Sequence, residues 1–318
     1  MARVFVTRDL PGSGLARLRA VHEVDLWTDA DAPPPDVLRQ RTSQADGLLC
    51  ILTNAIDADL IAACPKLKVI SNVAVGVNNI DLKAAGARRI PVGYTPDVLT
   101  AATADLTFAL ILAIARRLPE AITAVRDGSW LAWDPTFMLG RDVAGSTLGI
   151  IGLGRIGQAV KQRAKGFDMT VIDSGRPGGL PTPDSVALDE LLQRSDFVSI
   201  HCPLTADSHH LIGLDQLRLM KPTAYLINTA RGPIISQPAL ITALSEGLIA
   251  GAALDVTDPE PLATDDPLLD APNLIVLPHI GSATHATREA MVDLAVDNLI
   301  AGLADEPLPH QYAPSPHA

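Results

Sequence analysis

A glycine-rich turn gives this sequence its clearest chemical signal. Residues 152–157 read Gly-Leu-Gly-Arg-Ile-Gly, between an apolar run at Leu148–Ile151 and a helical pattern at Arg155–Lys165. In such a turn the first glycine permits a tight bend, the second lets the backbone approach a pyrophosphate, and the third allows helix and strand to pack closely. Free N–H groups at the helix start attract phosphate. The residues predicted to bind a dinucleotide here are Gly152, Gly154, Arg155, Ile156 and Gly157.

The end of the next strand bears on which dinucleotide fits. An acidic side chain that binds the adenosine ribose is expected about twenty residues after the glycines. This stretch reads Asp173, Ser174, Gly175, Arg176. If Gly175 occupies the ribose position, no carboxylate repels a 2′-phosphate and Arg176 can pair with it, so Ser174 and Arg176 are predicted to contact NADP. If Asp173 occupies it, NAD is preferred, and Arg176 is equally compatible with a solvated loop cation.

Alternating strand and helix patterns must position these residues. In the N-terminal part, strands are predicted at Val4–Thr7, Val24–Trp27, Gly47–Leu52 and Leu67–Ala74, with helices at Gly14–Ala20, Pro35–Arg41 and Ala58–Cys64. From Gly145 onward, strands are predicted at Leu148–Ile151, Met169–Asp173, Phe197–His201, Ala224–Asn228, Gly251–Asp255 and Leu274–Leu277. This alternation predicts an α/β fold with parallel sheets and crossover helices.

Two longer helices are predicted, one before and one after the second set of strands in the sequence. The run Ala101–Leu118 is apolar but contains Asp105 and ends near Arg116 and Arg117, which favours a buried helix at a domain hinge over a membrane span. The last helix is predicted at about Ala283–Leu303 and is amphipathic. With 318 residues, the chain is long enough for about two domains.

Composition limits the class of protein. Net charge is −11 and the basic residues are scattered, which argues against nucleic acid as a partner. The first residues lack an apolar stretch long enough for a signal peptide, so we expect a cytoplasmic protein. Cys50, Cys64 and Cys202 match neither zinc nor disulfide spacing and are predicted to be buried thiols. No cluster of ligands predicts a metal site.

Five separated segments occur in the order found in one enzyme family. They are Val75–Asp81, the glycine turn at 152–157, Asn228–Gly232, Asp255–Pro261 and Pro278–Thr284. Over nearly its whole length the chain thus resembles the D-2-hydroxyacid dehydrogenases. Further segments look most like the glyoxylate/hydroxypyruvate reductase branch: Thr95–Thr100, Ala132–Pro135 and Asp255–Thr257.

This resemblance implies a domain arrangement and a reaction. A Rossmann cofactor domain, residues 100–284, would be inserted in a flavodoxin-like substrate-binding domain made of residues 1–99 and 285–318, both doubly wound. The implied reaction transfers hydride from NADPH or NADH to a small 2-oxo acid such as glyoxylate or hydroxypyruvate. A homodimer through the cofactor domains is implied as well, with Leu118–Arg141 in the contact and Trp133 reaching a neighbour's substrate pocket.

Three catalytic roles are carried over by the resemblance. Arg231 would orient the substrate, His279 would donate the proton, and Glu260 would support His279. These types suit the chemistry, because a guanidinium matches a carboxylate and an imidazole exchanges protons near neutral pH. A nearby carboxylate favours the charged imidazolium. Glu260 also stands where the related formate dehydrogenases have Gln, which counts against formate as the substrate.

Other contacts are implied in the same way. The backbone N–H groups of Val75, Gly76 and Val77 would hold the substrate carboxylate. Further cofactor contacts are assigned to Pro203, Thr205, Thr229, Asp255, His279 and Gly281.

Alternatives stay open at this point. Taken singly, Arg231 is compatible with a surface ion pair, Glu260 with a solvated loop acid, and His279 with a buried structural imidazole. The glycine at position 76 is also compatible with an ordinary strand-to-helix turn. At the level of the whole chain, the rivals are a dehydrogenase for 3-phosphoglycerate or D-lactate and a dinucleotide-sensing protein of the corepressor type.

Overall fold

A computed structural model of the chain describes residues 1–175 and 182–313. The chain divides into two compact units: Met1–Leu99 with the segment that begins at Ser282, and Thr100–Gly281. The predicted boundary after residue 284 lies three residues beyond Gly281, where the second unit ends. Arg176 and the last five residues of the expected substrate domain lie outside the described residues.

The first unit is built on a five-stranded parallel sheet. Its order is β2-β1-β3-β4-β5, the arrangement of flavodoxin-like sheets. The strands are β1 (Arg3–Val6), β2 (Glu23–Leu26), β3 (Gly47–Cys50), β4 (Val69–Asn72) and β5 (Val92–Gly93). The helices are α1 (Gly14–Val21), α2 (Pro35–Thr42), α3 (Ala58–Ala63), α4 (Leu82–Ala87) and α11 (His285–Leu303).

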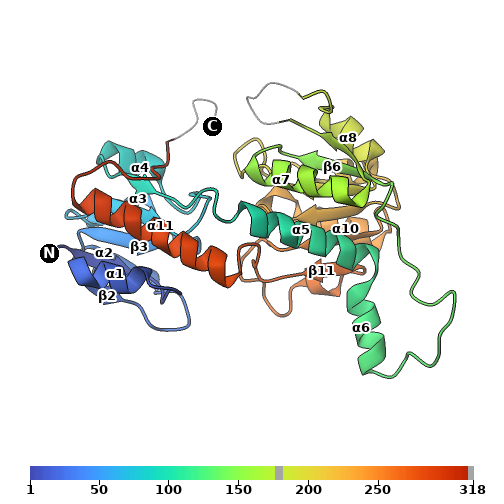
Figure 1. Cartoon of the computed structure of the whole chain (residues 1–318), viewed down its shortest axis with the longest axis horizontal. Coiled ribbons are helices and arrows are strands. Elements are labelled where there is room, and N and C mark those ends of the chain that lie inside the picture. Colours follow the sequence, from blue (N-terminus) through green and yellow to red (C-terminus); the bar gives the residue numbers. More distant parts are fainter. Residues whose placement is uncertain (176–181, 314–318) are drawn as a thin grey trace. The chain divides into compact units, whose positions relative to one another are not determined.

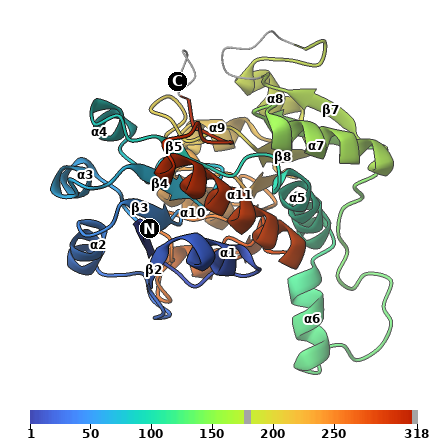
Figure 2. The ribbon, with the colours of Figure 1, turned by 60° about the vertical axis from the view of Figure 1, so that its left-hand side comes forward.

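Helices cover both faces of this sheet (Figure 2). On one face α11 lies against β3 and β4, where Gly47 approaches Leu299 and Gly302 approaches Val69. On the other face Phe5, Leu48 and Ile70 pack with side chains of α2, α3 and α4. Aspartates cap two of those helices, because Asp57 accepts from the N–H of Leu60 and Asp81 from that of Ala84.

The second unit contains a six-stranded parallel sheet. Its order is β11-β10-β9-β8-β6-β7, so the chain reverses its direction of travel across the sheet beside β6. The strands are β6 (Thr147–Ile151), β7 (Thr170–Asp173), β8 (Phe197–Ile200), β9 (Tyr225–Asn228), β10 (Gly251–Leu254) and β11 (Leu274–Val276). In such sheets ligands bind at the carboxyl ends of the strands, next to this switch point.

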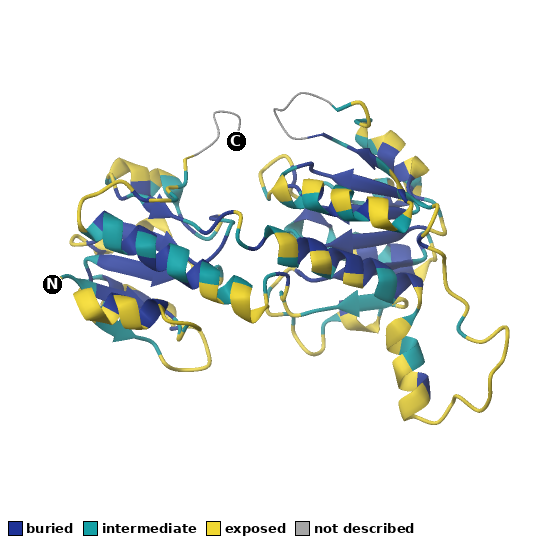
Figure 3. Cartoon of the chain, viewed as in Figure 1, coloured by how far each residue is buried: buried dark blue, intermediate teal, exposed yellow. Residues whose placement is uncertain are grey.

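Helices again form two layers. The α-helices are α5 (Thr100–Ala115), α6 (Leu118–Arg126), α7 (Arg155–Ala164), α8 (Leu188–Arg194), α9 (Leu214–Leu219) and α10 (Gln237–Ser245). Short 3₁₀ turns are η1 (Lys165–Phe167), η2 (Gly232–Ile234) and η3 (Pro267–Asp270). Ile150 and Ile227 face the core beneath α5 and α7, whereas Ile151 and Leu226 face the core beneath α8, α9 and α10. Figure 1 shows α5 and α7 over the sheet, and Figure 3 shows the buried strands.

The expected α/β class with two parallel-sheet units is confirmed. The helix expected at Ala101–Leu118 is present as α5 but ends three residues early, at Ala115, and Arg117 adopts a left-handed conformation (φ 53°) before α6 begins. Pro119 in the first turn of α6 suits such a restart, since proline lacks the N–H that a continuous helix needs.

The cysteines and the lengths of the helices bear on two further expectations. The three cysteines are free and buried, as predicted. Among the described residues, none of the helices has the length and apolar character that a membrane span requires.

Candidate active site

The glycine turn has the geometry that a dinucleotide phosphate needs. Gly152 adopts φ +93°, and a Cβ there would lie 2.5 Å from the backbone nitrogen of Cys202. At Gly157 a Cβ would lie 2.3 Å from the carbonyl oxygen of Gly152, so the helix can approach the strand only with glycine. Beside Gly154, in contrast, there is open space, and α7 begins at the next residue without a side-chain cap. These residues therefore fit a bound pyrophosphate.

Asp173 at the end of β7 is fully buried and occupied by internal bonds. Its carboxylate accepts hydrogen bonds from Lys161 Nζ (3.0 Å), Thr182 Oγ1 (3.0 Å), Ser185 Oγ (2.7 Å) and the N–H of Gly175 (2.9 Å). Burial alone would raise the pKa of this carboxyl, but these bonds outweigh it and hold the pKa below its ordinary value. Asp173 is thus a structural anion.

The next two residues hold the glycine turn. Ser174 Oγ accepts from the N–H of Gly152 at 3.2 Å, and the carbonyl of Gly175 accepts from the N–H of Leu153 at 2.9 Å. Gly175 has φ +73°. The end of β7 therefore supports the turn directly, and the side chain that follows the strand at this point is a hydroxyl.

Arg231 follows β9 and is positioned by a close backbone approach. A Cβ on the neighbouring Gly232 would lie 1.9 Å from the carbonyl oxygen of Thr257, so only glycine lets these two segments pass each other. Asn228 fixes the turn, since its Nδ2 donates to the carbonyl of Arg231 at 2.9 Å. Burial lowers the pKa of Arg231, and the charge of Glu260 acts in the opposite direction. The guanidinium stays charged even so, because an arginine starts far above neutral pH.

Glu260 and His279 form a direct pair. His279 Nδ1 lies 2.8 Å from Glu260 Oε2, and both side chains are about a quarter exposed, 24% and 25%. The other carboxylate oxygen, Oε1, accepts from the N–H of Thr257 at 3.1 Å. The structure thus brings Arg231, Glu260 and His279 together, although they come from three separate stretches of the sequence.

The backbone of His279 is held in an unusual conformation by Asp255. His279 has φ 54°, a left-handed value that costs about 1 kcal/mol or more for a residue other than glycine. Its N–H donates to the carbonyl of Asp255 at 2.9 Å, and the next two N–H groups, those of Ile280 and Gly281, donate to the Asp255 carboxylate at 2.7 Å each. Burial raises the pKa of Asp255, and these two bonds partly counter the rise.

Three further predicted contacts lie at the carboxyl ends of β8 and β9. Thr229 is buried, and its Oγ1 lies 3.1 Å from Thr107 Oγ1 of α5. Pro203 and Thr205 are exposed in the loop after β8, which Ser208 closes through bonds to both. In the same stretch burial lowers the pKa of His201 to about 3, so its imidazole is neutral.

The predicted carboxylate-binding loop lies in the first unit. Val75 and Gly76 are partly exposed and Val77 is buried. Within residues 1–175 and 182–313, the N–H groups of these three residues have no hydrogen-bond acceptor. Consecutive N–H groups of this kind form a concavity that suits an anion.

Trp133 lies in the long segment between α6 and β6. Its side chain is 82% exposed, and neighbouring Trp130 and Leu131 are exposed as well. Within this unit, therefore, Trp133 packs against little of its own chain.

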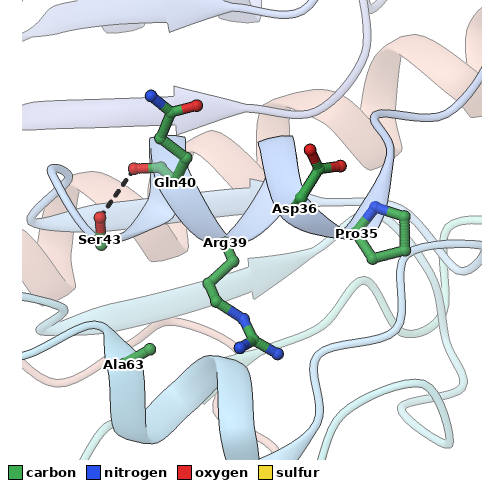
Figure 4. A pocket seen from close by; sticks show the side chains of 6 residues that line it. All are labelled: Pro35, Asp36, Arg39, Gln40, Ser43 and Ala63. Atoms are coloured by element: carbon green, nitrogen blue, oxygen red, sulfur yellow. Dashed lines mark hydrogen bonds between the residues drawn. The ribbon is translucent and has the colours of Figure 1, made fainter.

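A separate surface pocket contains none of the predicted residues. It lies in the first unit, has a volume of about 560 Å³ and is lined by Pro35, Asp36, Arg39, Gln40, Ser43 and Ala63 (Figure 4). In that view Asp36 and Arg39 project from α2. Across the described parts of the chain, no three His, Cys, Asp or Glu side chains are grouped as metal ligands would be.

Several side chains that support the site were missed from the sequence. Asn72 and Asn79 bond beneath the loop at Val75–Val77, and Lys161 neutralises Asp173. For Asn79 the only signal was its place in the segment Val75–Asp81. Asn72 bonds to Gly76 and Asn79 in the segment that follows it, but nothing in its residue type predicts those bonds. Lys161 meets Asp173 only because α7 packs beside the end of β7.

Comparison with known proteins places this geometry in a family. A family profile described as "D-isomer specific 2-hydroxyacid dehydrogenase, NAD binding domain" matches residues 108–281. A glyoxylate reductase from Korarchaeum cryptofilum is 50% identical, with 94% of this chain and 92% of that protein covered. A human glyoxylate reductase/hydroxypyruvate reductase is 45% identical, with 98% of each covered. The crystal structure of an NADPH-dependent glyoxylate/hydroxypyruvate reductase from Sinorhizobium meliloti in complex with NADP and malonate superposes with a TM-score of 0.85, at 33% identity, covering 98% of this chain and 97% of that one.

Proposed function

Since the chain belongs to the D-isomer specific 2-hydroxyacid dehydrogenases, NAD(P)-dependent enzymes, we propose that it reduces glyoxylate and hydroxypyruvate to the corresponding 2-hydroxy acids. The observation that carries the proposal is the His279–Glu260 pair at 2.8 Å beside the partly buried Arg231. The full-length similarity to glyoxylate reductases supports the choice of substrate.

In the proposed reaction each of these side chains has one task. Arg231 binds the carboxylate and polarises the keto oxygen, for which its planar guanidinium is suited. His279 gives a proton to the oxygen as the carbon is reduced. Because Nδ1 is bonded to Glu260, the donor is Nε2, and the carboxylate stabilises the charged ring and fixes its orientation.

A reduced nicotinamide supplies the hydride when bound. The phosphates would be held by Gly152, Gly154 and the first N–H groups of α7, at Arg155, Ile156 and Gly157. We assign Thr229, Asp255, His279 and Gly281 to the nicotinamide end, and Pro203 and Thr205 to the middle of the cofactor. Asp255 would act through the turn it holds, since both carboxylate oxygens already accept N–H bonds.

We also propose that the substrate carboxylate is bound by the N–H groups of Val75, Gly76 and Val77. Their lack of acceptors among the described residues supports this role. Backbone donors fixed in advance need no reorganisation when the anion arrives.

For the cofactor we favour NADP over NAD. The bonds that occupy Asp173 engage the carboxylate at the end of β7, where a group that binds an adenosine ribose is expected. Ser174 and Gly175 carry no charge that would repel a 2′-phosphate. The NADP complex of the Sinorhizobium meliloti reductase supports the same preference.

We further propose a homodimer through the second unit. The segment from α6 to Leu139 exposes apolar side chains that a partner would cover: Leu118, Ile122, Val125, Trp130, Leu131, Trp133, Phe137 and Leu139. A partner subunit would also give Trp133 a surface to pack on, in keeping with a place at the neighbour's substrate pocket.

Paired substitutions test this surface by sedimentation. Ile122→Asp with Val125→Asp places two charges on α6 and is expected to yield monomers. Leu269→Asp, at another exposed apolar residue of the same unit, is the control and should leave the dimer intact. A wild-type monomer, or a double variant that stays dimeric, contradicts the proposal.

The free, buried thiols suit a reducing compartment, and we place the enzyme in the cytoplasm. Cell fractionation with a compartment marker tests this.

Steady-state kinetics decide the main proposal. Glyoxylate, hydroxypyruvate, pyruvate and phosphohydroxypyruvate are compared, each with NADPH and NADH, by absorbance of the reduced nicotinamide. We expect the highest kcat/KM with one of the first two acids and with NADPH. A preference for pyruvate or phosphohydroxypyruvate would favour the lactate or phosphoglycerate alternative. Binding of the cofactor without turnover of any acid would favour dinucleotide sensing.

A further inference from the structure

Two amide side chains, those of Asn72 and Asn79, lie beneath the loop at Val75–Val77. Asn72, at the end of β4, donates from Nδ2 to the carbonyl of Gly76 at 2.9 Å and to Asn79 Oδ1 at 3.0 Å. Its own Oδ1 lies 3.5 Å from Cys50 Sγ. Asn72 is fully buried, so each of these bonds satisfies a group that water does not reach.

The network continues into the loop after β3. Asn79 Nδ2 donates to the carbonyls of Ile51 (3.2 Å) and Asn54 (3.0 Å). In turn, Asn54 Oδ1 accepts from Thr7 Oγ1 at 2.7 Å and from the N–H of Ile51 at 3.0 Å. Three amide side chains thereby tie the loops after β3 and β4 to each other and to the end of β1.

The bond to Gly76 fixes the direction of a peptide group. A trans peptide is planar, and its C=O and N–H point to opposite sides. Because the carbonyl of Gly76 points to Asn72, the N–H of Val77 points away from the network, and it has no acceptor among the described residues. Rotating this peptide would aim the N–H of Val77 at the buried Nδ2 of Asn72, and a buried donor left without an acceptor costs about 1–3 kcal/mol.

Cys50 supplies the last donor of the network. Burial raises the pKa of its thiol to about 12, so the sulfur keeps its proton and can donate to Asn72 Oδ1. The amide of Asn72 then has both its oxygen and its nitrogen bonded, which sets the orientation of the side chain.

We propose that Asn72 and Asn79 are positioning residues that orient the Gly76–Val77 peptide for binding the substrate carboxylate. The inference rests on the proposed function, because it requires this loop to receive a 2-oxo acid. It assigns substrate affinity to side chains that lie under the loop and never touch the ligand. A change in the orientation of the loop should therefore lower the affinity for glyoxylate and leave the affinity for the cofactor unchanged.

Asn72→Leu tests the idea, since leucine is similar in size and cannot donate. The KM for glyoxylate should rise about tenfold, the worth of roughly one well-made hydrogen bond, with kcat changed less than threefold and the KM for NADPH unchanged. The Kd of oxalate, measured with NADPH bound by quenching of its fluorescence, should rise by a similar factor. This second readout reports binding without turnover.

Ser71→Ala is the matched control from the same strand. Ser71 is equally buried and loses a 2.7 Å bond to the carbonyl of Ala295, which has no part in the loop. It should lower the melting temperature while leaving both KM values unchanged. A general loss of stability would move both variants alike, whereas loss of positioning moves only Asn72→Leu.

The possible results distinguish the role of Asn72 from the proposed function of the enzyme. A folded Asn72→Leu protein with wild-type KM for glyoxylate and wild-type oxalate affinity overturns the inference and leaves the proposed function intact. A wild-type protein that reduces no 2-oxo acid overturns the proposed function itself. If Asn72→Leu does not fold, Asn79→Ala is judged by the same criteria, because it removes the bonds to Ile51 and Asn54.

Discussion

The two units present different chemistry at their candidate sites. In the second unit the groups are charged side chains, Arg231, Glu260 and His279, brought together from three stretches. In the first unit they are neutral backbone N–H groups held by buried amides. A charged side chain can be lost by one substitution, whereas a backbone donor survives any substitution that keeps the loop in place. The second unit should therefore be the more sensitive to single changes.

The largest effect is expected at the proton donor. His279→Ala should lower kcat/KM for glyoxylate about a thousandfold, the usual contribution of a positioned general acid. Circular dichroism and the Kd for NADPH should stay close to wild type. The loss of the Asn72 network is expected to raise the KM for glyoxylate only about tenfold. A smaller loss of kcat/KM in His279→Ala than in Asn72→Leu would therefore contradict the greater sensitivity expected of the second unit.

Glu260→Gln should have an intermediate effect. The imidazolium loses its ionic partner but keeps a hydrogen-bond acceptor, so activity at pH 7 should fall about tenfold. Glu246→Gln, at an exposed glutamate of the same unit, is the control and should keep wild-type activity. Wild-type activity in Glu260→Gln would show that the pair has no part in proton donation.

The smallest effect on turnover is expected at Asp173. This carboxyl has a pKa below its ordinary value in the folded protein, so it stabilises the fold above about pH 4 and loses that contribution as the pH falls through the folded pKa. Asp173→Asn should thus lower the free energy of unfolding at pH 7 by about 1–3 kcal/mol and change it less at pH 3, with kcat preserved.

Urea denaturation at both pH values measures this, with exposed Asp207→Asn as the control. A loss of stability that is equal at pH 7 and pH 3 would mean that the charge of Asp173 is not what stabilises the fold. The expected result would show that the charge of Asp173 stabilises the fold, whereas the charges of Arg231, Glu260 and His279 in the same unit serve catalysis.

What could be predicted from the sequence follows the range of the interactions involved. The glycine turn is a local pattern, and the positions of Gly152 and Gly157 could be assigned from the run of strand, glycines and helix. The meeting of Arg231, Glu260 and His279 depends on the whole sheet and was reachable only through the resemblance to a family.

The rest depends on which side chains meet once the chain is folded. Whether Asp173 faces a ribose or the interior depends on Lys161 of α7 and on Thr182 and Ser185, which precede α8. The role inferred for Asn72 depends on how the chain after β4 bends, so that the carbonyl of Gly76 meets its side chain. The end of α5 at Ala115 was not predicted, because the helical pattern of Ala101–Leu118 does not show that Arg117 adopts a left-handed conformation.

Gly232 limits how this protein could be redesigned. The carbonyl of Thr257 occupies the space of any β-carbon at that position, so a library that randomises the neighbourhood of Arg231 would lose almost every member that changes this residue. Diversity aimed at new substrates is better placed at positions where a side chain has room. The same crowding makes position 232 a simple internal marker: surviving clones should encode glycine there.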